Sequence, residues 1–368
     1  MPVRKNMPKQ LINSKIDEIT FWKGVAILMI ILTHSHQMFN LPYSMRMIPM
    51  FGQMGCQIFF VLSCFGLCLS YERRAPKYIE FLKRRIKSIS IGYWLTIVLT
   101  LLLSLFAEKI FGENIFLTCT NKIKVIENVF FLHGLDPSID GNNMVVRGGW
   151  FIGTLVILYV LFPILFHLYI NIKIRYRNLF PYGIAILCVL SLVFLYVVDD
   201  NLEVRRNSFL YFSFVNQLPS FIMGFVLYDW YRNEEQKDNH SLLYGTILLV
   251  MSFMIFHISS PLSYILLSFV FSFGFVNIYK SPPHVYCKSI CNRVYEVVKK
   301  YGEYSYAIYL IHPFIAFELS KLIISLIKLP EWLLYILWLP ILFIIIFVVG
   351  KAYNTLIETI KLHVYNYQ

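Results

Sequence analysis

The sequence predicts an all-α membrane protein of about ten transmembrane helices, and three observations lead to this fold class. The chain of 368 residues is 58% hydrophobic and only 15% charged, whereas soluble domains carry roughly 25% charged residues. The apolar residues lie in runs of about 18 to 22, which is long enough for a helix to cross a bilayer. These runs are too long and too uniformly apolar for the strands of a membrane β-barrel.

Ten apolar runs can be placed between clusters of charged residues, and each is predicted to form one span. Most of the 33 Lys and Arg residues fall in segments on one side of the membrane when the spans alternate in direction. The positive-inside rule makes that side the cytoplasm, and an even number of spans then places both termini there. The predicted spans cover residues 19–39, 49–70, 88–107, 150–169, 180–198, 208–229, 241–258, 262–279, 304–326 and 332–350.

We expect residues 1–368 to form a single membrane-embedded domain with short cytoplasmic tails at 1–18 and 351–368. No cleavage site of small residues closes the first apolar run, so this run is predicted to be a span and not a signal peptide. The net charge of +12 is explained by membrane topology, and no nucleic-acid partner is expected. Most of the seven cysteines lie inside apolar runs, which argues against a disulfide framework.

Two basic side chains lie in the first predicted span, where ionisable groups are costly and tend to face a protein-lined cavity. Lys23 and His34 are separated by about three helical turns and therefore share one face, with His34 roughly 16 Å deeper than the cytoplasmic mouth. His36 points elsewhere and is expected to be interfacial. Lys23 has an alternative role as a helix-end residue that extends toward water, and His34 has one as a hydrogen-bond partner of a neighbouring helix.

A basic cluster lies between the second and third predicted spans. Positive-inside anchoring needs fewer charges than this cluster holds, so we expect an additional anionic ligand. Guanidinium groups bind phosphate through paired hydrogen bonds, which favours a phosphate-bearing ligand that enters from the cytoplasm; lipid headgroups are the alternative. The cluster consists of Arg73, Arg74, Lys77, Lys83, Arg84, Arg85 and Lys87.

The ninth predicted span carries a polar stripe formed by Ser305, Tyr309 and His312, which helical geometry places on one face. Pro313 follows at once and is expected to kink or locally unwind the helix, which frees a backbone carbonyl that needs a partner. Hydrogen bonding between helices is the structural alternative for this stripe.

Motifs of other enzyme classes are missing from the sequence. It contains no glycine-rich phosphate loop, no dinucleotide-binding fingerprint and no nucleophile elbow. His284, Cys287 and Cys291 lack a second pair of ligands, so no metal site is predicted.

Five motifs occur in order along the chain. The first is the basic residue and His of the first span, separated by ten residues. The second is GCQIFFVLSCFGLCLS in the second span, and the remaining three are FLKRRIKSISIGYW, the outer loop and span that begin at GGW, and YSYAIYLIHPF. Taken in this order, the five motifs resemble those of the acyltransferase-3 family of bacterial membrane acyltransferases. The residues that match the family patterns include Lys23, His34, Phe59, Phe60, Ser63, Phe81, Arg84, Arg85, Ile89, Tyr93, Trp94, Gly148, Gly149, Trp150, Tyr159, Pro163, Ser305, Tyr309 and His312.

The sequence also departs from the family pattern. Lys23 replaces the commoner Arg, Ser88 replaces a third Arg and Cys64 replaces a Gly. Leu155 and Val156 stand where an acidic pair often follows the Trp. The last departure argues against a catalytic carboxylate from the fourth span and is consistent with a subgroup that uses a different acceptor.

The resemblance implies an O-acyltransferase of the bacterial cell (inner) membrane. It implies transfer of an acyl group, most often acetyl from acetyl-CoA, to a hydroxyl of a surface polysaccharide or lipid-linked glycan. Acetyl-CoA or another acyl-CoA would be a co-substrate, and no permanently bound cofactor is expected. The partners would be membrane lipid, acyl-CoA and a carbohydrate acceptor, and the oligomeric state is left open.

The same resemblance suggests roles for the polar residues. Lys23, Arg84 and Arg85 would bind the phosphates of the donor. His34 would act as general base toward the acceptor hydroxyl, and a nucleophilic role through an acyl-imidazole fits equally well. Tyr309 or His312 would orient the acceptor or donate to the thioester oxygen. The candidate residues of an acceptor or acyl pocket are Ser63, Trp150, Ser305, Tyr309 and His312.

Two other classes of function compete with the enzyme. A transporter or exporter of a glycan precursor or anionic metabolite would also use buried His and Tyr residues within its spans. A non-catalytic scaffold would leave the alignment of Lys23 with His34 unexplained. An enzyme adds one acyl unit to the mass of its acceptor, whereas a transporter changes only the compartment of its substrate.

Overall fold

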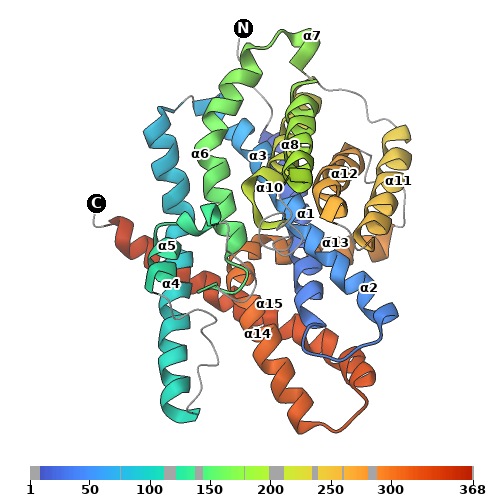
Figure 1. Ribbon diagram of the computed structural model, residues 1–368. Coiled ribbons are helices and arrows are strands. Elements are labelled where there is room, and N and C mark those ends of the chain that lie inside the picture. Colours follow the sequence, from blue (N-terminus) through green and yellow to red (C-terminus); the bar gives the residue numbers. More distant parts are fainter. Residues whose placement is uncertain are drawn as a thin grey trace. The chain divides into compact units, whose positions relative to one another are not determined.

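The computed structural model describes residues 9–74, 76–111, 122–136, 144–177, 179–198, 211–233, 239–258, 261–280 and 288–366. Every regular element within these ranges is a helix (Figure 1). Eight of the described helices are long and apolar enough to cross a membrane. The prediction of an all-α polytopic membrane protein is therefore confirmed.

The remaining two predicted spans coincide with α10 (Phe214–Asn233) and α11 (Asn239–Phe256). The apolar part of α11 is shorter than that of the eight spans. Helix α10 includes Asn216, Gln217 and Asp229 and is not among the eight. The cytoplasmic location of both termini stays a prediction.

The contacts divide the chain into two compact units that are interleaved along the sequence. Unit 1 consists of Met1–Ile58 and Pro283–Asn354, and unit 2 of Phe59–Pro282 and Thr355–Gln368. Two helices, α3 (Gly55–Arg74) and α15 (Glu331–Asn366), contribute to both units. That the whole chain functions as a single domain stays a prediction.

Unit 1 is built around α1 (Lys9–Ser35), which contacts α13 and α14 and the short helices that follow it (Figure 1). Glycine allows α1 and α13 to approach closely, because a Cβ atom on Gly24 would lie 1.9 Å from the carbonyl oxygen of Val298. Phe21 stacks on Tyr295 with ring centroids 4.7 Å apart. The other elements of unit 1 are α2 (Tyr43–Phe51), η1 (Gly52–Met54), α13 (Lys288–Glu303) and α14 (Ser305–Leu326).

Unit 2 contains the basic cluster and an aromatic core. Helices α6, α8, α10 and α12 pack together, and Phe225 of α10 stacks on Tyr169 of α6 with centroids 4.6 Å apart. Helix α11 packs along α12 (Figure 1). The elements not yet introduced are α4 (Tyr78–Phe111), α5 (Lys122–Val129), η2 (Leu132–Leu135), α6 (Trp150–Asn171), α7 (Ile174–Arg177), α8 (Leu179–Val198) and α12 (Pro261–Lys280).

Several helices extend beyond the predicted spans, because charged residues set the ends of those spans. The third predicted span begins at residue 88, but α4 begins at Tyr78 and includes Arg84 and Arg85. Long unbranched Lys and Arg side chains favour a helix, so an apolar helix can extend through a basic segment. For the same reason α1 begins at Lys9 and α15 reaches Asn366, so that much of each predicted tail is helical.

Candidate active site

Two histidines predicted from separate motifs lie side by side in unit 1. His34 is near the end of α1 and His312 is in α14, two helices that pack together. Their ring centroids are 5.1 Å apart, with an angle of 47° between the ring planes. Phe317 packs edge-on against His34 at 5.5 Å. The structure therefore brings together groups that are distant in the sequence.

Pro313 determines the orientation of the His312 ring. A proline has no backbone N–H, so the carbonyl of Tyr309, four residues earlier, loses its helical partner. His312 Nδ1 lies 2.8 Å from this oxygen and 3.1 Å from the carbonyl oxygen of Ile308. Carbonyl oxygens only accept hydrogen bonds, so Nδ1 carries the proton. Nε2 is then an unprotonated acceptor.

The free nitrogen of His312 is buried without a partner. The residue is 0% exposed, and Nε2 has no hydrogen-bond partner among the described residues. A buried polar atom in this state costs about 1–3 kcal/mol. A ligand hydroxyl or a protonated neighbour that donates to Nε2 would remove this cost.

His34 is oriented by a residue in the turn that follows α1. Its Nδ1 lies 3.1 Å from Oε1 of Gln37, so Nδ1 is the donor and Nε2 is left unprotonated. The side chain is half-buried. Both histidines therefore keep an unprotonated Nε2, which is the form of the atom that a base or a nucleophile requires.

The other predicted site residues of unit 1 lie along the same two helices. Tyr309 is 5% exposed and its ring centroid is 5.6 Å from that of His312. Ser305 is the first residue of α14 and is buried. Lys23 is half-buried in α1, and the unbroken helix from Lys23 to His34 supports their predicted common face. Helix α14 continues through Pro313, so the predicted local unwinding does not occur.

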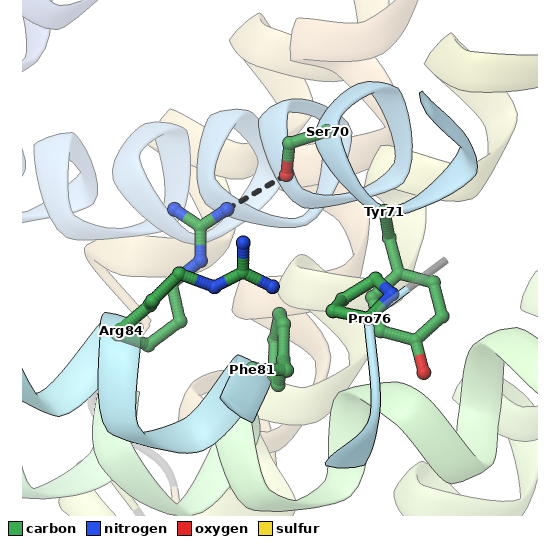
Figure 2. A pocket seen from close by; sticks show the side chains of 6 residues that line it. Ser70, Tyr71, Pro76, Phe81 and Arg84 are labelled. Carbon is green, nitrogen blue, oxygen red and sulfur yellow. Dashed lines mark hydrogen bonds between the residues drawn. The ribbon is translucent and has the colours of Figure 1, made fainter. Parts of the chain in front are cut away.

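Arg84 and Arg85 line a pocket of about 140 Å³ in unit 2. Arg85 Nη2 donates to the Ser70 hydroxyl over 2.7 Å, and its guanidinium lies 5.7 Å from the centroid of Phe81 (Figure 2). Arg84 is exposed, and its Nε donates to the carbonyl oxygen of Glu80 over 3.2 Å. The pocket is lined by Ser70, Tyr71, Pro76, Phe81, Arg84 and Arg85.

The composition of this pocket suits a phosphorylated ligand with a flat ring. Two guanidinium groups offer paired donors to phosphate oxygens. Phe81 and Tyr71 add aromatic surface beside them (Figure 2). Within the described residues the pocket has no acidic lining residue, so no carboxylate of the lining competes for the arginines.

Ser63 and Trp150 occupy different surroundings in unit 2. Ser63 is half-buried in α3. Trp150 is 7% exposed and packs on Phe212 with ring centroids 4.9 Å apart and on Tyr211 at 5.5 Å. Its surroundings are those of an aromatic core, and its role in an acceptor pocket stays a prediction.

Sequence reasoning gave no role to His133, which is part of a buried network before α6. Its Nε2 lies 3.0 Å from the carbonyl oxygen of Gly149, and Tyr93 donates its hydroxyl to Asn128 Oδ1 over 2.6 Å. Gly148 has a φ of 75°, a backbone conformation that favours glycine. Burial lowers the pKa of His133. In the sequence, the two glycines before Trp150 indicate a tight turn and a close backbone contact at the start of α6.

A metal site finds no support in the part of the chain that the structure describes. No group of three or more His, Cys, Asp or Glu side chains is arranged there to hold a metal ion. His284 and Cys287 lie outside the described residues.

The family model of an acyltransferase domain, Acyl_transf_3, matches residues 16–351. The match covers nearly the whole chain, including both histidines and both arginines, and the chain belongs to this family. The protein is therefore a membrane acyltransferase, in agreement with the resemblance of its motifs. Searches of curated proteins and of solved structures find no match.

Proposed function

We propose that this membrane acyltransferase moves an acetyl group from acetyl-CoA to a hydroxyl of a surface polysaccharide or lipid-linked glycan in the bacterial cell membrane. The observation that carries the proposal is the packing of His34 against His312, with ring centroids 5.1 Å apart. Family membership supports acyl transfer over the transporter alternative.

In the first route His34 is a general base. Its Nε2 removes the proton of the acceptor hydroxyl while the hydroxyl oxygen attacks the thioester carbonyl. The new C–O bond forms, the C–S bond breaks, and the departing CoA thiolate receives the proton from His34. The hydrogen bond to Gln37 keeps Nε2 available for this transfer. His312 Nε2 would accept a hydrogen bond from a second acceptor hydroxyl and so orient the sugar.

In the second route His34 is the nucleophile. Its Nε2 attacks the thioester carbonyl, the C–S bond breaks, and an acyl-imidazole forms as CoA thiolate leaves. The acceptor hydroxyl then attacks the acyl carbon while His312 Nε2 removes its proton. The C–N bond to His34 breaks in this step, and the proton passes from His312 to CoA thiolate or to water.

The donor would be held through its phosphates. Arg84 and Arg85 line the pocket of unit 2. Donor binding by Lys23 of unit 1 stays a prediction. CoA carries several phosphate groups and an adenine ring, which match the guanidinium groups and the aromatic lining of this pocket.

Label transfer tests this function. Membranes that contain wild-type protein or His34→Ala at matched levels are incubated with radiolabelled acetyl-CoA and glycan acceptor. We expect label in the glycan with wild type and a loss of about 10²–10⁴-fold with His34→Ala, because proton transfer by a positioned base contributes this much. His363→Ala is the control, since His363 is exposed near the end of α15 and should retain full activity.

The possible outcomes test the catalytic residue, the acyl donor and the acceptor separately. Activity retained by His34→Ala would remove this residue from the mechanism. Label that appears with another acyl-CoA but not with acetyl-CoA would correct the donor. If native glycan extracts and a range of acyl-CoAs gave no label with wild type, the proposed donor and acceptor classes would both be abandoned. A mass increase of one acetyl group on the glycan would confirm the covalent change.

A further inference from the structure

One wall of the arginine pocket in unit 2 is the last turn of α3. Ser70 and Tyr71 of this turn line the pocket, and α3 ends at Arg74. The last carbonyl groups of a helix have no partners within the helix, so the final turn opens more easily than the middle. The wall of the pocket therefore depends on the contacts that this turn makes with other helices.

One face of the turn is bonded to the pocket's own residues. Ser70 Oγ donates to the carbonyl oxygen of Leu67 over 3.0 Å and accepts from Arg85 Nη2 over 2.7 Å (Figure 2). The ring of Tyr71 packs edge-on against Phe81 of α4 with centroids 5.4 Å apart. The position of the Arg85 guanidinium therefore depends on how well Ser70 is held.

The opposite face of the turn carries an ion pair with α10. Arg232 Nη1 lies 3.3 Å from Glu72 Oε1, and the two side chains are 32% and 31% exposed. Glu72 follows Ser70 by two residues, a rotation of about 200° on a helix, so the two side chains leave α3 in nearly opposite directions. The last turn of α3 is thus held from both sides, by α4 through Ser70 and by α10 through Glu72.

The ion pair follows from the packing of α3 against α10. A Cβ atom on Gly224 of α10 would lie 2.6 Å from the Cβ atom of Cys64 in α3, so this glycine allows the two helices to approach closely. Glu72 and Arg232 each lie eight residues beyond this contact in their own helices. The two helices therefore run parallel, and the same register that packs Gly224 on Cys64 brings the two charges together.

A glutamate is unfavourable at this position unless it is paired. Glu72 lies two residues before the end of α3, and a negative charge in the last turn of a helix is disfavoured by the helix dipole. Its charge also lies beside a pocket that is proposed to bind an anion. Arg232 offsets both effects, which indicates that the pair has a role in holding this turn.

We propose that Glu72 and Arg232 are positioning residues for the acyl donor, because they hold the last turn of α3 and with it the wall of the arginine pocket. This inference rests on the proposed function, since it takes the pocket as the site of the CoA phosphates. Neither residue lines the pocket, so the pair acts on the donor through the helix. Loss of the pair weakens donor binding and leaves the histidines of unit 1 unchanged.

The variant Glu72→Gln distinguishes positioning from simple electrostatics by the sign of its effect. It removes a negative charge beside a site for a polyanion, so electrostatics alone would tighten the binding of CoA. Positioning predicts that the Kd for CoA and the KM for acetyl-CoA rise about twofold to fivefold, on the scale of one partly exposed ion pair, with kcat unchanged. Arg232→Gln should give the same rise. The double variant should be little worse than either single variant, because both changes remove one interaction.

Two measurements give these constants. Thermal stabilisation of the purified full-length protein in detergent by CoA gives Kd without an acceptor, and label transfer from acetyl-CoA gives KM and kcat. Arg232→Lys keeps the charge and should have a Kd close to that of wild type. Glu358→Gln is the matched control, because it breaks an ion pair with Lys361, 2.8 Å long and within α15, that does not line the pocket.

The opposite results would overturn the positioning role. A Kd for CoA that falls or stays unchanged in Glu72→Gln would do so, and a lower Tm without ligand combined with the wild-type Kd would limit the pair to stability. Arg85→Ala separates this inference from the proposed function. If its Kd is raised while that of Glu72→Gln is not, only the positioning role fails; if its Kd is unchanged, the proposed donor site fails and the positioning role fails with it. Because the titration contains neither acyl group nor glycan, a failed transfer experiment leaves it standing.

Discussion

The histidine pair of unit 1 and the arginine pocket of unit 2 differ in how their side chains are held. His312 is fully buried, and its ring is bonded to the backbone of its own helix. Arg84 is exposed, and Arg85 reaches across to a hydroxyl of a neighbouring helix. A buried neutral imidazole with a free lone pair suits proton transfer, whereas guanidinium groups around an open pocket suit the binding of an anion. We therefore expect substitutions in unit 1 to lower kcat and substitutions in unit 2 to raise KM.

The largest effect should come from the two histidines together. We expect His34→Gln to lower kcat about 10³-fold and His312→Gln about 10²-fold, on the scale of general acid–base catalysis. The double variant should be little worse than His34→Gln, because residues that act as a unit have non-additive effects. Single-turnover rates in membranes with matched protein levels would measure this, with His363→Gln as control. Fully additive losses would mean that the two histidines act independently.

The arginine pocket should give the next largest effect. We expect Arg85→Ala to raise the apparent KM for acetyl-CoA about tenfold to a hundredfold, because a charged hydrogen bond to phosphate is lost. Arg84→Ala should have a smaller effect, since its side chain is exposed and less restrained. Lys328→Ala is the matched control, as Lys328 is exposed, lies outside the basic cluster and does not line the pocket. An unchanged KM in both variants would make these arginines topology anchors.

A smaller effect is expected from Pro313→Ala, which tests whether the proline fixes the orientation of the His312 ring. Pro313→Ala adds a backbone N–H that can bond to the Tyr309 carbonyl oxygen, which His312 Nδ1 otherwise occupies. The ring would then lose part of its orientation, and we expect kcat to fall roughly threefold to tenfold with an unchanged KM for acetyl-CoA. Pro340→Ala makes the same exchange inside α15 and should leave kcat unchanged. Equal kcat values for Pro313→Ala and wild type would show that the proline does not position His312.

The smallest predicted effect is on the free energy of unfolding. It comes from His133, which belongs neither to the histidine pair nor to the arginine pocket. Burial lowers the pKa of His133, so below about pH 6.5 the unfolded chain binds a proton that the folded protein does not. Stability from this residue is therefore present above that pH and is lost as the pH falls, by at most ~1.4 kcal/mol per pH unit.

Unfolding experiments in detergent at several pH values would measure this slope. His133→Gln should flatten the dependence of the unfolding free energy on pH below about pH 6.5. His363→Gln, at an exposed position, should keep the wild-type slope. An identical slope in His133→Gln would mean that His133 titrates alike in the folded and unfolded chains.

Sequence patterns predicted the spans well and the other helices poorly. Each of the ten apolar runs overlaps a helix, because a run of about 20 apolar residues has few alternatives to a membrane helix. The run 49–70 begins in α2, passes through η1 and continues in α3. Helices α2 and α13 were missed, since they are short or polar on one face and stand out only once they pack against α1. The predicted third span excludes the basic segment at Arg84, because the charge of this segment, and not its helix propensity, sets the predicted boundary.

For the candidate site as well, the sequence predicts features within one helix, and the tertiary structure decides which helices bring their side chains together. The sequence by itself determined the polar stripe of Tyr309 and His312, the carbonyl freed by Pro313 and the common face of Lys23 and His34, because all of these follow from the geometry of one helix. The tertiary structure alone decided that His34 meets His312 and that Arg85 bonds to Ser70. These pairings join different helices, and their register depends on how side chains pack between helices, which the periodicity of a single helix does not specify.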